Sequence, residues 1–303
     1  MHQESKLPLT SIFLALLVAV VWGFNFVMVK LSLTTIPPLT LCAIRFFLCA
    51  FPMVFFVPFP RSHTRYILGY GIITFGTQFA LLFTGVALGV SPGTAALISQ
   101  TQVFFGIFFA WFLLNQTVTP IQLLGACIAL SGIGLLFLHH DSSLSIIGFF
   151  LIILASISWG LGNLISTQLR QVPTLSLMSW SSLVAFCMLT ALAFIFENPL
   201  PYIQHPFSFH LMTYFTLAYI VYGSTYIGYG CWSWLLSRYP FASISPFALL
   251  CPIIAMIGSA IVFHESLTTT KIIAGLLVIL GVAINSFGRQ VASLITTVKQ
   301  KIK

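Results

Sequence analysis

The chain has 303 residues, of which 59% are hydrophobic and 5% are charged, and its mean hydropathy is +1.06. A soluble domain carries roughly 25% charged residues, so this composition excludes a soluble globular protein and predicts an all-α integral membrane protein. The net charge of +8 is explained by the basic bias of cytoplasmic loops, so we expect a lipid bilayer and no nucleic acid as a partner.

The N-terminal residues 1–8 are polar and precede an apolar run at residues 9–30. That run is too long for the core of a secretory signal peptide, and no small-residue cleavage pattern follows it. We therefore predict a short cytoplasmic N-terminus, residues 1–8, followed by a retained transmembrane helix.

Ten segments have about 20 mostly apolar residues each, the length that spans a bilayer as a helix. Turn-forming residues such as Pro37, Pro92 and Pro120 separate them. An even number of crossings places both termini on the same side of the membrane. The ten predicted helices cover residues 9–30, 38–58, 66–88, 93–114, 121–138, 146–168, 175–196, 211–236, 243–263 and 270–288.

The positions of lysine and arginine predict the orientation of these helices. With both termini inside, Lys30 and Lys271 lie at outer helix ends and Arg45 lies within a helix. The reversed orientation would leave the outer side rich in basic residues, so we predict an N-in/C-in protein of the bacterial inner membrane. The remaining basic residues are then cytoplasmic: Lys6, Arg61, Arg65, Arg170, Arg238, Arg289, Lys299, Lys301 and Lys303.

The two halves of the sequence align with each other. The segment "LLNQTVTPIQ" (113–122) matches "VFHESLTTTK" (262–271) at an offset of 149, and a Trp-Gly pair at 22–23 returns at 159–160. Each half holds five predicted helices, and an odd number inverts the second half in the membrane. Inverted repeats of this kind are common in secondary transporters, which bind substrate near the midplane between the halves.

The repeat predicts how the chain is divided into segments. The first five-helix repeat, residues 9–138, is joined by a periplasmic linker, residues 139–145, to the inverted second repeat, residues 146–288. A basic cytoplasmic tail, residues 289–303, follows. Its apolar residues recur at helix-like intervals, so it either lies as a helix on anionic lipid or is disordered.

Acidic residues avoid the predicted membrane core. Glu4, Asp141, Glu197 and Glu265 all fall in termini, loops or helix ends. Proton-coupled pumps commonly use intramembrane acids or histidines, so we do not expect coupling through a buried carboxylate. Passive efflux, exchange and coupling through the peripheral pair His264 and Glu265 stay open.

Amides, hydroxyls and aromatic rings recur at mid-membrane depth. In the fourth predicted helix, Ser99 and Gln102 belong to a stripe of small and polar residues, which either lines a cavity or packs closely against another helix. A midplane site of this chemistry suits a small polar or zwitterionic solute. The candidate pathway residues are Gln78, Ser99, Gln102, Ser224, Tyr226 and Tyr229.

Arg45 lies inside the second predicted helix and has no acid at similar depth. A central arginine costs about 2.5–3.5 kcal/mol on insertion scales. Two interpretations stay open. The side chain either snorkels outward to helix-end carbonyls, or it attracts an anionic group of the substrate.

Each Trp-Gly pair is followed by an asparagine, Asn25 in the first half and Asn163 in the second. Counted along helices that run in opposite directions, these two amides lie toward opposite faces of the membrane. We therefore predict that they mark the outer and inner mouths and do not form one site. The candidate gate or mouth residues are Trp22, Asn25, Arg45, Trp159 and Asn163.

The segments "WGFNFVMVK", "PPLTLCAIRF", "SQTQVFFG" and "HESLTTTKIIAGLLVILGV" together resemble the EamA family of the drug/metabolite transporter superfamily. The resemblance covers about residues 9–288 and points to the bacterial exporters of cysteine and O-acetylserine type metabolites. It implies a ten-helix inverted repeat and efflux of amino-acid metabolites by alternating access, with Gln78, Gln100 and Gln102 on the pathway. Gln116 departs from the pattern, because such sequences often carry glutamate there.

Export of small amino-acid metabolites is the leading hypothesis. Uptake, or transport of a nucleobase or a toxic drug-like compound, is the alternative, since the sequence does not give direction. A membrane enzyme is a remote alternative, because neither H-E-x-x-H nor G-x-S-x-G occurs. The cysteines lack metal-type spacing, so we expect no metal or cofactor. The oligomeric state stays open, with a homodimer as one alternative.

Overall fold

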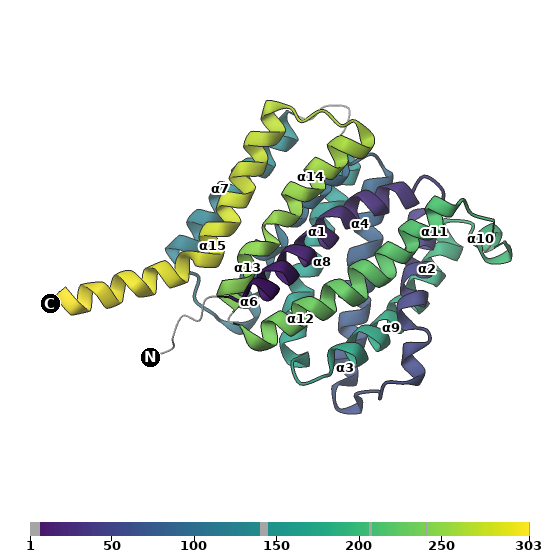
Figure 1. Cartoon of the computed structure of the whole chain (residues 1–303), viewed down its shortest axis with the longest axis horizontal. Helices are drawn as coiled ribbons and strands as arrows, with labels where there is room; N and C mark the ends of the chain where they lie inside the picture. The colour runs from purple at the N-terminus through teal and green to yellow at the C-terminus, as the bar shows by residue number, and fades with distance from the viewer. Residues whose placement is uncertain (1–6, 140–144, 206–207, 240, 303) are drawn as a thin grey trace.

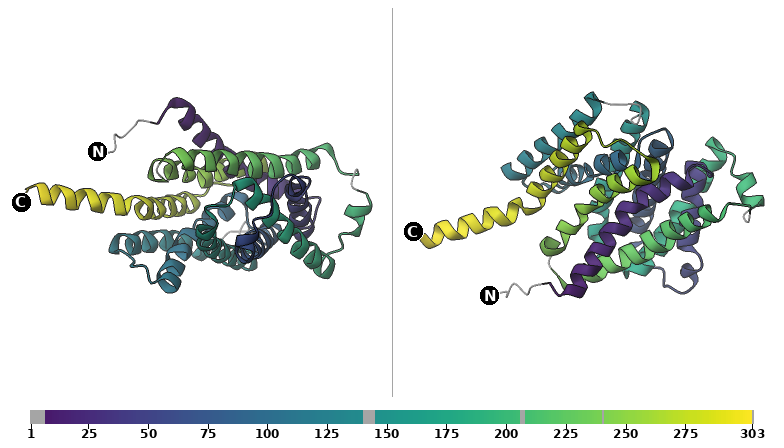
Figure 2. Two further views of the ribbon diagram at one scale, coloured as in Figure 1. Left: turned by 90° about the horizontal axis from the view of Figure 1, so that it is seen from below. Right: turned by 45° about the horizontal axis from the view of Figure 1, so that its top comes forward.

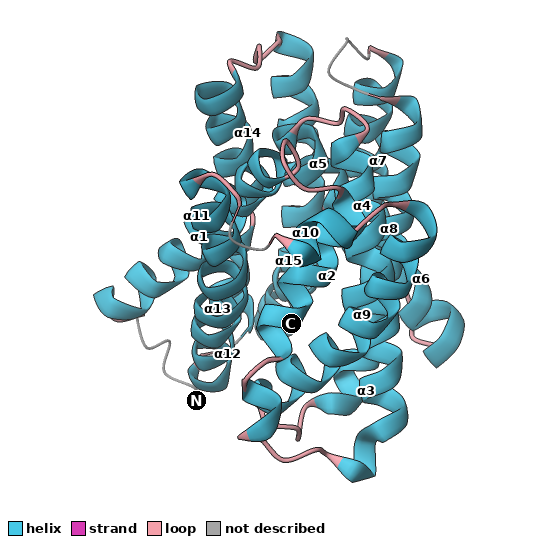
Figure 3. Ribbon diagram, turned by 90° about the vertical axis from the view of Figure 1, so that its right-hand side faces the viewer, coloured by secondary structure: helices cyan, strands magenta, loops and turns pink. Residues whose placement is uncertain are grey.

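The computed structural model describes residues 7–139, 145–205, 208–239 and 241–302, which contain helices and loops but no strand (Figures 1 and 3). The all-α prediction is confirmed for these residues. Most of the predicted N-terminus and linker, with Glu4 and Asp141, lie outside the described residues, and so does residue 303 of the predicted tail.

Many large apolar side chains lie on the outer surface of the helix bundle, as expected for a protein surrounded by lipid. The longer elements of the first half are α1 (Leu9–Ser32), α2 (Pro38–Ala50), α3 (Thr64–Tyr70), η3 (Gly71–Thr77), α4 (Gln78–Ala87), α5 (Pro92–Ser99), α6 (Gln102–Leu114) and α7 (Pro120–Leu138). Those of the second half are α8 (Ile146–Ser166), α9 (Thr174–Phe196), α10 (Leu200–Gln204), α11 (Leu211–Ala218), η5 (Tyr219–Gly228), α12 (Tyr229–Arg238), α13 (Phe241–Ala248), α14 (Leu250–Phe263) and α15 (Thr269–Ile302).

Nine helices of the described residues are long and apolar enough to cross a membrane. The nine match nine of the ten predicted segments, and the segment at 211–236 is the one left out. There α11, η5 and α12 continue one another from Leu211 to Arg238, but glycine, tyrosine and hydroxyl residues interrupt the apolar ones. This composition lowers the mean hydropathy of a helix that is long enough to span.

Two predicted helices, at residues 93–114 and 243–263, are each interrupted in their first half. The break between α5 and α6 follows Gln100, and the break between α13 and α14 is at Leu249, which lies 149 residues later. The Thr101 hydroxyl donates to the Ile98 carbonyl at 2.7 Å, and Pro252 has no N–H to donate to the carbonyl four residues before it. At the first break the Thr101 hydroxyl competes with backbone N–H groups for a carbonyl, and at the second break Pro252 lacks the backbone donor. Each effect interrupts the helical hydrogen bonds.

Helices of the two halves pack in a symmetrical set of pairs. The second helix of the first half, α2, packs against the second helix of the second half, α9. The fifth helices, α7 and α15, pack against each other in the same way. The first helix of each half packs against the fourth of the other, as α1 with α14 and α8 with α6. Figure 1 shows α7 and α15 side by side at the edge of the bundle.

The glycines of the two Trp-Gly pairs lie at these crossings. A Cβ on Gly23 would lie 2.7 Å from the Cβ of Ile254, and a Cβ on Gly160 would lie 2.8 Å from the Cβ of Phe105. Ile254 follows Phe105 by the repeat offset of 149. The repeated glycine therefore lets the first helix of each half approach the fourth helix of the other half.

A glycine at the α7–α15 crossing is expected to be sensitive to substitution. A Cβ on Gly132 would lie 2.7 Å from the Ala274 carbonyl oxygen, whereas one on Gly134 would meet nothing within 4 Å. Overpacking costs about 1–3 kcal/mol, so Gly132→Ala should lower the thermal unfolding temperature of the purified protein. Gly134→Ala is the matched control and should leave it unchanged or raise it slightly. Equal unfolding temperatures for the two variants would contradict this packing.

The basic tail continues α15 as a helix to Ile302. The tail is therefore helical and projects away from the bundle (Figure 2), and its position on anionic lipid stays a prediction. The connection between α9 and α11 contains the short helix α10.

Candidate functional site

A cavity of about 430 Å³ lies where the broken helices meet α1, α2, α4, α8 and the η5–α12 segment. Aromatic and aliphatic side chains form much of its wall, and a few amides, hydroxyls and one guanidinium interrupt them. This combination is typical of small-molecule sites. Eleven of the twelve candidate pathway and mouth residues line it: Trp22, Asn25, Arg45, Gln78, Ser99, Gln100, Gln102, Trp159, Asn163, Ser224 and Tyr229.

Tyr226 is the candidate that does not line this cavity. Its hydroxyl donates to the Cys49 carbonyl at 2.5 Å, and its ring stacks on Tyr222 with centroids 6.2 Å apart. The prediction counted depth along the helix and did not fix rotation about the helix axis. Tyr229, three residues later, does reach the cavity.

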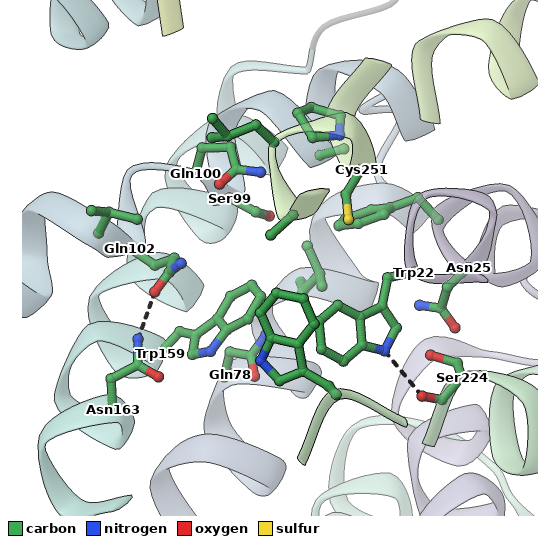
Figure 4. Close-up of a pocket in the computed structure, with 18 of the residues that line it drawn as sticks. Trp22, Asn25, Gln78, Ser99, Gln100, Gln102, Trp159, Asn163, Ser224 and Cys251 are labelled. Atoms are coloured by element: carbon green, nitrogen blue, oxygen red, sulfur yellow. Dashed lines mark hydrogen bonds between the residues drawn. The ribbon is translucent and has the colours of Figure 1, made fainter. Parts of the chain in front are cut away.

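Asn25 and Asn163 line the same cavity, whereas the sequence predicted that they do not form one site; their assignment to an outer and an inner mouth stays a prediction. In Figure 4, Asn163 and Gln102 lie on one side of the cavity, and Asn25 lies with Trp22 and Ser224 on the other.

The amide side of the cavity is held together by a direct hydrogen bond. Asn163 Nδ2 on α8 donates to Gln102 Oε1 at 2.6 Å. Gln102 is the first residue of α6, directly after the helix break, and Ser99 precedes the break with its hydroxyl donating to the Ala95 carbonyl at 2.7 Å. The break therefore brings Gln102 to the cavity, where Asn163 fixes its orientation.

The indole side of the cavity is built around Trp22. Its Nε1 donates to the Ser224 carbonyl at 3.1 Å, and its ring centroid lies 5.2 Å from that of Tyr229 and 5.3 Å from that of Trp232. Sequence analysis missed Trp232, although its position one helical turn after Tyr229 places it on the same face. Asn25 Oδ1 is buried nearby with no hydrogen-bond partner among the described residues.

Arg45 is 2% exposed, so the interpretation in which it snorkels outward is wrong. Its Nη2 donates to Thr225 Oγ1 at 3.1 Å. The guanidinium carbon lies 4.4 Å from the ring centroid of Phe79 and 5.5 Å from that of Phe46. Three aromatic and hydroxyl side chains thus hold a buried cation at the cavity wall.

The peripheral pair His264 and Glu265 lies outside this cavity. His264 ends α14 with a left-handed backbone, φ 53°. Glu265 accepts hydrogen bonds from Ser91 at 2.6 Å and from Ser259 at 2.5 Å, and its carboxylate lies 3.1 Å from Lys271 Nζ. Glu265 therefore connects the loop before α5 to the two ends of the α14–α15 connection, and its role in coupling stays a prediction.

Comparison with known proteins decides the family. The signature of the EamA-like transporter family matches residues 9–138 and again residues 146–287. The chain belongs to the EamA-like transporter family. It is therefore a multi-pass transporter of the bacterial inner membrane and not an enzyme.

Curated relatives cover nearly the whole of this EamA chain. A protein of Escherichia coli (strain K12) named "Probable amino-acid metabolite efflux pump" is 35% identical, over 91% of this chain and 94% of its own length. A Salmonella typhimurium protein of the same name is 36% identical, over 92% and 95%. A solved structure titled "Crystal structure of protein" shares the fold, with a TM-score of 0.61 and 15% identity over 91% of this chain and 96% of that one.

Proposed function

We propose that this EamA transporter exports small amino-acid metabolites of the cysteine and O-acetylserine type across the inner membrane. The observation that carries the proposal is a cavity, lined by residues of both halves, that combines amides, hydroxyls and indole rings. Such a lining fits a small polar or zwitterionic solute. The names of the two curated relatives, which are efflux pumps for amino-acid metabolites, support the same substrate class.

The proposed architecture is ten transmembrane helices in two inverted five-helix repeats, with both termini cytoplasmic. The continuous helix from Leu211 to Arg238 supplies the tenth crossing. The double match to one family, the paired breaks at Gln100 and Leu249, and the reciprocal packing of helix pairs all support the repeat. The excess of basic residues on one side supports the orientation.

Alternating access follows as the proposed mechanism. In inverted-repeat transporters, one half rocks against the other around a site near the midplane. The two breaks flank the cavity and lack part of the helical hydrogen bonding, so they offer positions where α6 and α14 bend during that motion. The mouth roles of Trp22, Asn25, Trp159 and Asn163 are proposed as contacts at the two sides of this cavity.

Substitution of Gln102 tests the proposal. Cells that overexpress the wild-type protein should release cysteine and O-acetylserine into the medium, and Gln102→Ala should reduce this release about 2- to 10-fold, because it removes the hydrogen bond to Asn163 and a polar group of the cavity. Gln116→Ala is the matched control, since Gln116 is exposed on a connecting loop. Untargeted comparison of the media measures the effect at equal membrane levels of protein.

Two outcomes of this comparison would contradict the proposal. If wild-type cells retain every amino-acid metabolite at control levels, export of this class fails. If Gln102→Ala and Gln116→Ala release equal amounts, Gln102 does not belong to the site. Counterflow in proteoliposomes with a panel of amino acids and nucleobases then tests uptake or a different solute.

A further inference from the structure

We propose that Arg45 is the residue that binds the carboxylate of the transported solute, so that the cavity selects solutes with a free carboxylate group. This inference rests on the proposed function, because it names the part of the amino-acid metabolite that the cavity recognises. It is carried by the burial of Arg45, by its unused hydrogen-bond donors and by the absence of a neutralising acid among the described residues.

The charge of Arg45 has no carboxylate partner within the described part of the chain. The two acids described there are engaged elsewhere and do not line the cavity. Glu197 accepts hydrogen bonds from the backbone N–H groups of Leu39 and Thr40 at 2.8 Å each, and Glu265 pairs with Lys271. A buried charge is normally paired with another charge or with a ligand. An anionic solute would supply the negative charge that the described residues do not place beside Arg45.

The guanidinium also has donors that no group of the described residues accepts. Nη2 reaches Thr225 Oγ1, but Nε and Nη1 are buried without a hydrogen-bond partner in the described structure. The rings of Phe46 and Phe79 provide cation–π contact and accept no strong hydrogen bond. A carboxylate accepts two parallel hydrogen bonds from a guanidinium, which is the geometry that arginine recognises best.

A complementary group lies on the neighbouring helix. Asn25 on α1 lines the same cavity as Arg45 on α2, and its Oδ1 is a buried acceptor without a donor among the described residues. Two residues of the cavity lining therefore carry unused donors and an unused acceptor. An α-amino acid satisfies both, because its carboxylate accepts from Arg45 and its ammonium group donates to Asn25.

Binding to the purified full-length protein in lipid nanodiscs tests this assignment. The probes are L-cysteine and its carboxamide, which differ in the carboxylate alone. Trp22, Trp159 and Trp232 line the cavity, so quenching of tryptophan fluorescence reports occupancy. Loss of a charge-assisted hydrogen-bonded pair should weaken binding of the carboxamide about 10- to 100-fold relative to cysteine.

Variants provide the second arm of the test. Arg45→Gln should bind L-cysteine about 10- to 100-fold more weakly than the wild type and should lose the preference for the acid over the carboxamide. Arg65→Gln, which changes an exposed arginine beside Tyr66, should keep wild-type affinity and preference. Should Arg45→Gln fail to fold, the comparison of the two probes on the wild-type protein decides the question without it.

The outcomes separate this inference from the proposed function. Equal binding of acid and carboxamide by the wild type, or an unchanged preference in folded Arg45→Gln, overturns the carboxylate site even when export is observed. Preferential binding of cysteine without export in cells leaves the carboxylate site standing and removes the export function. Binding of neither probe overturns the site.

Discussion

Replacing Glu265 by alanine is expected to destabilise the protein by about 3–5 kcal/mol, because it removes the carboxylate that neutralises a buried lysine. The side chains of Glu265 and Lys271 are each 9% exposed and lie 3.1 Å apart. The same carboxylate also accepts hydrogen bonds from Ser91 and Ser259, so three separate segments lose their common partner. Thermal unfolding of the purified protein in detergent measures the loss.

The two halves of the chain supply the control for Glu265. Gln116 occupies the matching position of the first half, and the residue before each, Asn115 and His264, has the same left-handed backbone with φ 53°. The double variant Glu265→Gln with Lys271→Met therefore removes both charges while keeping the local turn, and it should unfold closer to the wild type than Glu265→Ala does. A double variant less stable than Glu265→Ala would show that the charge pair is not the cause.

Replacing Trp22 by alanine is expected to cost about 3–5 kcal/mol and to abolish most export, because truncating a packed indole leaves a void. The indole contacts Tyr229 and Trp232 and bonds to the Ser224 carbonyl. It also lies against Gly228, where an added Cβ would collide with its Nε1. Trp22 therefore fixes α1 against the η5–α12 segment and forms the cavity wall at the same time.

Trp111 provides the comparison for Trp22. It is 50% exposed on the outer surface of α6 and contacts Phe108 and Phe112 of the same helix. Trp111→Ala should change the unfolding temperature little and leave export near the wild-type level, since it opens no cavity in the bundle. Similar export in both variants would mean that Trp22 does not form part of the solute site.

Much of the candidate site could be predicted, because a polar side chain within an apolar spanning segment is visible in the local sequence. Gln78 and Gln102 stand out as amides within apolar segments, and the cost of burying such groups in lipid makes an inward position the expected one. Both line the cavity. Tyr226 could not be separated from Tyr229 in this way, because a tyrosine at the same depth can face either side of its helix.

The sequence by itself determined the membrane class, the positions of nine spanning segments among the described residues and the correspondence between the two halves, because length, hydropathy and a constant offset are read along the chain. Only the tertiary structure decided that Asn25 and Asn163 share one cavity and that Arg45 is buried at its wall. It also decided that the helices break at Gln100 and Leu249. These features depend on helix tilt, on rotation about each helix axis and on competition for backbone carbonyls, and each is set by neighbours that lie far away in the sequence.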